Sequence, residues 1–158
     1  MGDEVRLDDL DWAILEVLRD DGRLPVAALA DRVQLSRAAC YARLERLRAS
    51  GVLEGFSARI NPAHSGQLMT AVLLLRIDQH RWSELAEVLV ELEAVEYCAL
   101  TTGEFDVLVL CRTPDMTTLR DVVLGRLAAM DAVRSTVTVF ALQELLHRPY
   151  VVADRRPR

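Results

Sequence analysis

Residues 24–48 read LPVAALADRVQLSRAACYARLERLR, and this stretch decides the fold of the first part of the chain. Apolar residues recur at helical spacing on both sides of Gln34-Leu35, so the stretch predicts two short helices joined by a tight turn. Pro25 suits the first turn of one helix, although it is a poorer cap than Ser or Thr, and Ser36 can cap the other. The pattern is typical of a helix-turn-helix, whose second helix enters the DNA major groove.

The second of these helices, predicted over residues 37–49, is strongly basic. Against one acid, Glu45, it carries four arginines: Arg37, Arg43, Arg46 and Arg48. The whole chain has a formal net charge of −5, so this helix is a local cationic surface on an acidic protein. Such a surface favours double-stranded DNA as the partner. The alternatives are a solvated helix face and, for Arg43, which lies beside the apolar stripe, an ion pair that braces the domain.

The apolar stripe of this helix fixes which residues can meet DNA. Cys40, Leu44 and Leu47 recur at helical spacing and must face the core. At about 100° per residue, the opposite side carries Ala38, Tyr41, Ala42, Glu45 and Arg46, and its small residues allow the helix to enter a groove deeply. The predicted DNA-binding residues are Ser36, Arg37, Ala38, Tyr41, Ala42, Arg43 and Arg46.

Residues on either side extend this unit into a winged helix-turn-helix over residues 1–60. A helix is predicted over about residues 9–19, with Asp8 as its cap. After Gly51, a helix stop, residues 52–60 (VLEGFSARI) predict a short β-hairpin that would form the wing. Pro and Gly punctuate residues 61–67, which are the predicted linker.

The second half, residues 68–158, alternates differently. It predicts a strand over 68–77, a helix over 82–92, strands over 95–102 and 106–112, a helix over 117–130 and a strand over 133–142. This βαββαβ order is the ferredoxin-like split motif, so the chain as a whole is of the α+β class. The sheet face without helices, with Val72, Leu74, Val109, Val137 and Val139 as candidates, predicts a homodimer paired sheet to sheet.

Composition and missing motifs exclude other classes. No apolar run approaches the ~20 residues of a membrane helix, and the acidic N-terminus lacks the layout of a signal peptide, so a cytoplasmic location without a membrane partner is expected. The three cysteines form no CxxC pair, so no metal site is expected. Neither GxSxG nor HExxH occurs, so we expect no catalytic residues, no enzyme activity and no cofactor.

The order of several short motifs resembles the Lrp/AsnC family, the feast/famine transcriptional regulators. The matching pieces are Leu7-Asp8-x-x-Asp11-x-x-Ile14-Leu15, Gly22-Arg23, Leu29-Ala30, Leu35-Ser36, Arg43-Leu44-x-x-Leu47-x-x-x-Gly51-Val52-Leu53, Asn61-Pro62 with Gly66, and Gly103-x-x-Asp106. The resemblance implies a ligand-sensing (RAM) second domain, dimers that often assemble to octamers, and an amino-acid effector bound between subunits. Gln34 replaces a frequent Gly; if that turn needs a positive φ, it stores on the order of 1 kcal/mol of strain.

The resemblance also implies an effector site around residues 103–106 (GEFD). The predicted effector-binding residues are Thr101, Thr102, Gly103, Glu104, Phe105, Asp106, Thr136 and Thr138. In this interpretation Asp106 meets the effector's ammonium group or orients the loop. The other interpretation is a plain hairpin turn in which Gly103 supplies a positive φ and the threonines are β-formers.

The sequence therefore predicts a sequence-specific DNA-binding regulator that responds to a small effector. Two recognition helices of a dimer would read a pseudo-palindromic site. One alternative is an enzyme that resembles the histidine-dependent sirohaem decarboxylases of the same fold. The scattered histidines His64, His80 and His147 give it little support, and an enzyme has no need of the cationic helix. Another is an assembly partner that does not bind DNA.

Overall fold

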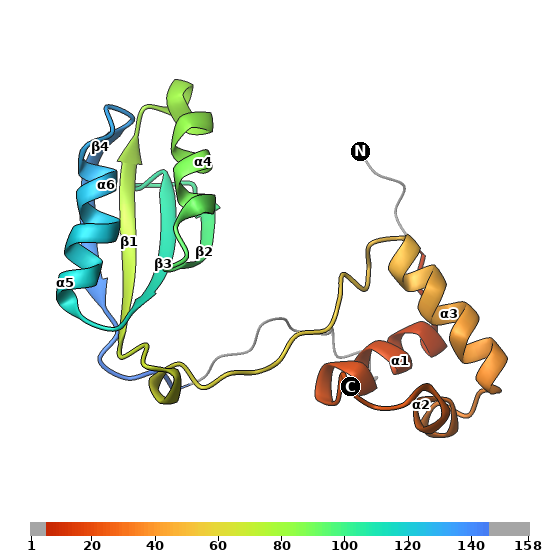
Figure 1. Ribbon diagram of the computed structural model, residues 1–158. Helices are drawn as coiled ribbons and strands as arrows, with labels where there is room; N and C mark the ends of the chain where they lie inside the picture. The colour runs from red at the N-terminus through yellow and green to blue at the C-terminus, as the bar shows by residue number, and fades with distance from the viewer. Residues whose placement is uncertain (1–5, 146–158) are drawn as a thin grey trace. The chain divides into compact units, whose positions relative to one another are not determined.

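A computed structural model describes residues 6–145 of the chain. These residues form two compact units, one ending at Arg59 and the other beginning at Ile60 (Figure 1). His147 and the end of the predicted second domain, residues 146–158, lie outside the described part. Among the helices described, none has the length and apolarity that crossing a membrane requires.

Three helices form the N-terminal unit: α1 (Asp9–Asp20), α2 (Val26–Arg32) and α3 (Arg37–Ala49). A capping box opens α1, in which Asp8 accepts a 2.9 Å hydrogen bond from the Asp11 N–H and Asp11 accepts a 3.0 Å one from the Asp8 N–H. Pro25 gives α2 no side-chain cap, whereas Ser36 Oγ accepts a hydrogen bond from the Ala39 N–H at 3.2 Å. The three predicted helices are confirmed.

The core of this unit follows the predicted stripe. Its buried members are Ile14, Leu18, Leu29, Ala30, Val33, Cys40, Leu44 and Leu47. The turn between α2 and α3 places Gln34 at φ 56°, so the condition for backbone strain at this residue is met. These features fix α3 against α1 and α2, with its other side exposed.

The predicted wing is wrong, because residues 52–60 contain no strand. The consecutive residues Val52 and Leu53 both pack against the helical core, whereas a strand would direct them to opposite faces. The Leu53 N–H donates to the Leu47 carbonyl at 3.0 Å, and Phe56 lies over Gly22. Residues 52–56 therefore pack along the helices, and their side chains do not alternate between two faces as those of a β-hairpin do.

The second unit contains a four-stranded antiparallel sheet in the order β2-β3-β1-β4. The strands are β1 (Met69–Ile77), β2 (Val95–Leu100), β3 (Val107–Thr113) and β4 (Val133–Phe140). Helix α4 (Trp82–Glu91) follows β1, and a continuous helical segment follows β3, made of α5 (Met116–Thr118), the π-helical turn η3 (Leu119–Leu124) and α6 (Gly125–Ala128). Two short turns, η1 (Ala63–Ser65) and η2 (Gln79–Arg81), precede β1 and α4. The predicted βαββαβ order is confirmed.

The helices cover one face of this sheet, as Figure 1 shows. The core between them joins Leu73, Leu75 and Val109 of the sheet to Leu85 and Leu127 of the helices. Val109 was expected on the open face; it is fully buried beneath the helices, because it pairs with Leu73 and shares that residue's face.

No helix of the described residues covers the opposite face of the sheet, and the centre of that face is apolar. Its apolar side chains, which are half-buried or exposed, are Val72, Leu74, Tyr97, Leu108, Leu110, Val137 and Val139. Thr70, Arg76 and Arg112 lie on the same face towards the ends of the strands. A contiguous apolar patch that is exposed to water is typical of a surface that binds another molecule.

Candidate functional site

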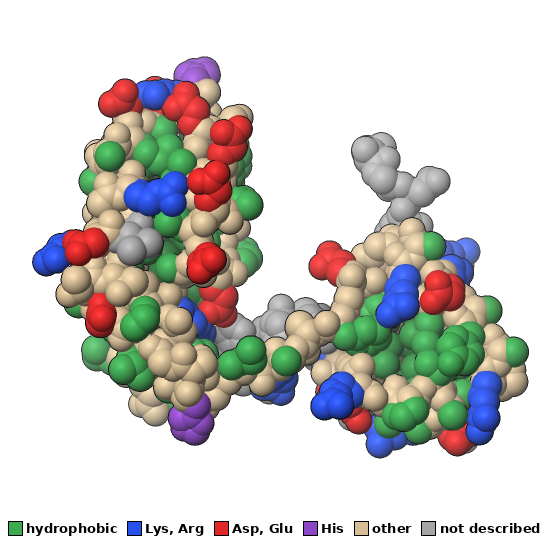
Figure 2. Space-filling view, in the orientation of Figure 1, with side chains coloured by type: hydrophobic (Ala, Val, Ile, Leu, Met, Phe, Trp, Pro, Cys, Tyr) green, Lys and Arg blue, Asp and Glu red, His purple; other side chains and the backbone are tan. Residues whose placement is uncertain are grey.

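Helix α3 has a buried face and an exposed face. Cys40, Leu44 and Leu47 are buried, whereas Ala38 and Ala42 lie on the exposed side. Tyr41, Ser36 and Arg37 are exposed as well, with Tyr41 at 57%. Figure 2 shows apolar side chains on one face of this unit with charged side chains distributed around them. Five of the seven predicted DNA-binding residues are therefore exposed: four lie on α3, and Ser36 is its cap.

The other two, Arg43 and Arg46, bind carboxylates of α1. Arg43 Nη1 lies 2.7 Å from an Asp8 oxygen and 2.8 Å from Asp11 Oδ1, and Arg46 Nη2 donates to Asp11 Oδ2. Asp11 is fully buried. Burial alone raises the pKa of Asp11, but hydrogen bonds from Arg46, from the Asp8 N–H and from Arg43 outweigh it and lower that pKa to about 2. The carboxylate is therefore ionised at neutral pH and holds both arginines.

These ion pairs show that two of the three predicted DNA-binding arginines, Arg43 and Arg46, are held by carboxylates within the chain. The Arg43 side chain is only 24% exposed, and its ion pairs brace α3 against the start of α1, as the alternative interpretation of this residue predicted. The Arg46 side chain is half exposed. Arg48 pairs with Glu45 at 3.6 Å. Among the described residues, Arg37 is the arginine of α3 that no carboxylate holds.

The role of Asp8 and Asp11 beyond helix capping was missed. A signal did exist: Asp8, the cap of α1, and Asp11 in its first turn are three residues apart, and Arg43 and Arg46 are three residues apart in α3. Pairs at this spacing lie on one face of a helix, so two helices packed side by side can match them.

The second candidate site is the turn between β2 and β3. Gly103 has φ 114°, which confirms the predicted positive φ. Thr101 closes the turn, because its hydroxyl donates to the Phe105 carbonyl at 2.7 Å and its N–H donates to the Asp106 carbonyl at 2.8 Å. Glu104 and Thr102 are exposed at its tip.

Asp106 ties this turn to the end of β1. Its Oδ1 accepts a hydrogen bond from Gln79 Nε2 at 3.0 Å, and its Oδ2 accepts one from the Ile77 N–H at 2.9 Å. These two bonds lower the pKa of Asp106. Both oxygens of Asp106 thus hold the turn to the end of β1, which is what the loop-orienting interpretation requires.

Arg76, which the sequence did not single out, completes this site. It forms a 2.8 Å ion pair with Glu104, and its guanidinium carbon lies 5.6 Å from the centre of the Phe105 ring. Sequence periodicity marks Arg76 only as a polar residue on a strand, which gives no sign of a partner 28 positions away.

Thr136 and Thr138 do not join this turn within one chain. They lie on β4, opposite Leu75 and Leu73, and so share the helix-covered face of the sheet. Because β1 separates β3 from β4, about 10 Å lies between β4 and the strand that carries the turn. The assignment of Thr136 and Thr138 to the effector site therefore stays a prediction, which requires a second subunit to bring them to the turn.

The described residues contain no group of three or more His, Cys, Asp or Glu side chains arranged to hold a metal ion. Both candidate sites carry groups that can bind a ligand: α3 presents an exposed face with the guanidinium of Arg37, and the turn of residues 101–106 presents charged side chains.

Two family models match the chain. Residues 7–48 match the AsnC-type helix-turn-helix domain, and residues 70–151 match the Lrp/AsnC ligand binding domain. The first covers α1 to α3, and the second covers the sheet and the turn of Gly103. The two predicted functional regions thus fall in separate matched domains.

Relatives match over nearly the whole length. An HTH-type transcriptional regulator of Pyrococcus furiosus is 31% identical over 87% of this chain and 90% of its own, and the leucine-responsive regulatory protein of Klebsiella pneumoniae is 31% identical over 95% and 93%. A transcriptional regulator from Neisseria meningitidis, solved as a complex with L-Met, has a TM-score of 0.86 and 28% identity over 92% of this chain and 96% of its own. The chain belongs to the Lrp/AsnC family of DNA-binding transcriptional regulators.

Proposed function

We propose that the exposed side of α3 reads a specific DNA sequence in the major groove. The observation that carries this proposal is that Ser36, Arg37, Ala38, Tyr41 and Ala42 are all exposed on one helix whose reverse side is buried. The small side chains of Ala38 and Ala42 allow close approach to base edges, and Arg37 can meet a phosphate or a guanine.

Arg46 and Arg43 have different parts in this proposal. Arg46 is half exposed, so its remaining N–H groups can donate to a phosphate while Nη2 stays on Asp11. Arg43 fixes the angle of α3 through Asp8 and Asp11. Arg46→Ala should weaken binding to all DNA sequences and flatten its salt dependence, and an unchanged salt slope would remove Arg46 from the interface.

The functional unit in this proposal is a homodimer joined through the open sheet face. Pairing two such faces removes Val72, Leu74, Val137 and Val139 from water. A two-fold dimer presents two copies of α3, which suits a pseudo-palindromic operator. Sedimentation of the purified protein distinguishes the dimer from an octamer.

An amino acid is the proposed effector, bound at the turn of residues 101–106 between subunits. The solved L-Met complex of the Neisseria relative supports this class of ligand. Backbone groups around Gly103 and the charges of Glu104 and Arg76 suit a zwitterion, whereas Thr136 and Thr138 would take part only if a second subunit brought them to the turn. Coupling to DNA affinity is typically ~1–3 kcal/mol.

Genomic SELEX with and without amino-acid pools tests operator binding and effector response together. Isothermal titration of the twenty amino acids into wild type and Asp106→Ala tests the turn: if both bind equally, Asp106 is structural only. We propose a cytoplasmic protein without enzyme activity. A shifted Soret band on adding sirohaem would contradict that and support the decarboxylase alternative.

A further inference from the structure

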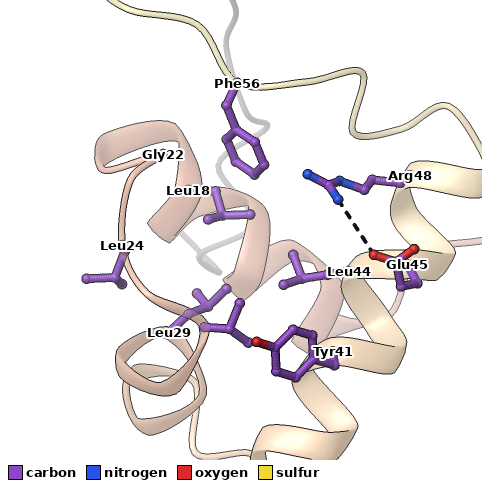
Figure 3. Close-up of a pocket in the computed structure, with 10 residues that line it drawn as sticks. Leu18, Gly22, Leu24, Leu29, Tyr41, Leu44, Glu45, Arg48 and Phe56 are labelled. Carbon is purple, nitrogen blue, oxygen red and sulfur yellow. Dashed lines mark ion pairs between the residues drawn. The ribbon is translucent and has the colours of Figure 1, made fainter.

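A pocket of about 150 Å³ opens beside α3 within the N-terminal unit. Leucines from three helices form its apolar wall, and two aromatic rings lie at its sides, as Figure 3 shows. The lining residues that matter here are Leu18, Leu24, Leu29, Leu44, Tyr41 and Phe56. An apolar cavity of about this volume accepts a group as large as benzene. The wall therefore fits one aliphatic or aromatic side chain.

The rim of this pocket carries one positive and one negative charge. Arg48 Nη1 and Glu45 Oε1 are 3.6 Å apart, which is longer than the ~2.7–2.9 Å of a direct charge-assisted hydrogen bond. Both side chains are more than half exposed, and an ion pair that is this exposed to water contributes little stability. Arg48 also lies 5.5 Å from the centre of the Phe56 ring, which keeps its guanidinium over the pocket.

We propose that this pocket binds an α-amino acid with an aliphatic or aromatic side chain. The side chain would occupy the leucine-lined wall, the α-carboxylate would accept hydrogen bonds from Arg48, and the α-ammonium would donate to Glu45. A plain carboxylate would meet repulsion from Glu45, and a plain amine would meet repulsion from Arg48. The paired rim charges thus select a zwitterion over either singly charged analogue.

This site is distinct from the turn of residues 101–106, because every lining residue belongs to the unit that ends at Arg59. Tyr41 belongs both to the pocket and to the proposed DNA-reading surface. If that proposed function holds, an amino acid bound here acts on the recognition helix directly, within one domain. Operator binding measured without any amino acid tests the proposed function separately.

Methyl NMR of the full-length protein, with L-leucine as the probe, tests the site. Saturable shifts are expected at the methyl groups of Leu18, Leu29 and Leu44, with millimolar affinity or tighter. The same titration with 4-methylpentanoate and with isopentylamine should show binding weaker by about fivefold or more, because each lacks one of the two charges. Shifts confined to leucines of the second unit would overturn the proposal and leave the effector turn unaffected.

Charge variants complete the test. Arg48→Gln and Glu45→Gln should each weaken leucine binding by about fivefold or more, since each removes a charged partner. Arg37→Gln, on the same helix, and Glu16→Gln, exposed on α1, remove the same charges away from the pocket and should leave leucine binding unchanged. Equal affinity in all four variants would contradict the proposal.

Discussion

Replacing Asp11 with Asn should loosen the recognition helix from α1. The change keeps the shape of the side chain but removes the charge that holds Arg43 and Arg46. Asp11 is fully buried, and its pKa is about 2 in the folded protein against 3.8 ordinarily. A difference of this size corresponds to about 2 kcal/mol of stability at pH 7.

The pH dependence of this effect has a definite sign. A carboxylate whose pKa is lowered by folding stabilises the protein above its unfolded pKa, and this stabilisation is lost as the pH falls through the folded pKa. The free energy of unfolding of wild type should therefore be about 2 kcal/mol higher than that of Asp11→Asn at neutral pH. This difference should disappear as the pH falls from about 4 to about 2.

Urea unfolding followed by Trp12 fluorescence measures this difference. The chain has two tryptophans, so a Trp82→Phe background makes the signal specific to α1. Glu16→Gln, which removes an exposed charge of α1, is the matched control and should change stability by less than about 0.5 kcal/mol. A destabilisation by Asp11→Asn below about 0.5 kcal/mol at pH 7, or one that persists unchanged at low pH, would refute this reasoning.

Three further changes test other parts of the account. Gln34→Val should destabilise the N-terminal unit by about 1–2 kcal/mol in the same assay, because a β-branched residue tolerates a positive φ poorly, while Gln34→Gly should be close to neutral; equal effects would exclude backbone strain. Ser36→Ala should cost about 1 kcal/mol and reduce operator affinity through loss of the cap on Ala39; an unchanged unfolding midpoint would contradict this. Val137→Asp should weaken the proposed dimer about tenfold or more in sedimentation experiments, and an unaltered dissociation constant would move the dimer contact elsewhere.

The sequence predicted most of the fold because local periodicity carries that information. The buried stripe of Cys40, Leu44 and Leu47 and the order of the second unit both follow from spacing within one element. The prediction of a wing was wrong because it also used only local information. The β-propensity of residues 52–60 does not reveal that Val52 and Leu53 pack on the helical core.

The sites were predicted less completely, because they depend on partners distant in sequence. The periodicity of α3 assigns Arg43 to the border of the helix but does not reveal that Asp8, 35 positions earlier, faces it. Likewise, the sequence does not reveal that β1 lies between β4, which carries Thr136, and β3, which follows the Gly103 turn. Tertiary packing, rather than propensity, decides such contacts.

We propose that the exposed side of α3 contacts DNA through Arg37, the arginine of this helix that no carboxylate among residues 6–145 holds. The most direct measurement is the salt dependence of operator affinity for wild type, Arg37→Gln and Arg48→Gln. If Arg37 contacts a phosphate, Arg37→Gln should lower affinity and reduce the slope of log K against log salt by about 1, while Arg48→Gln should leave the slope unchanged. An Arg37→Gln protein with wild-type affinity and slope would contradict the account.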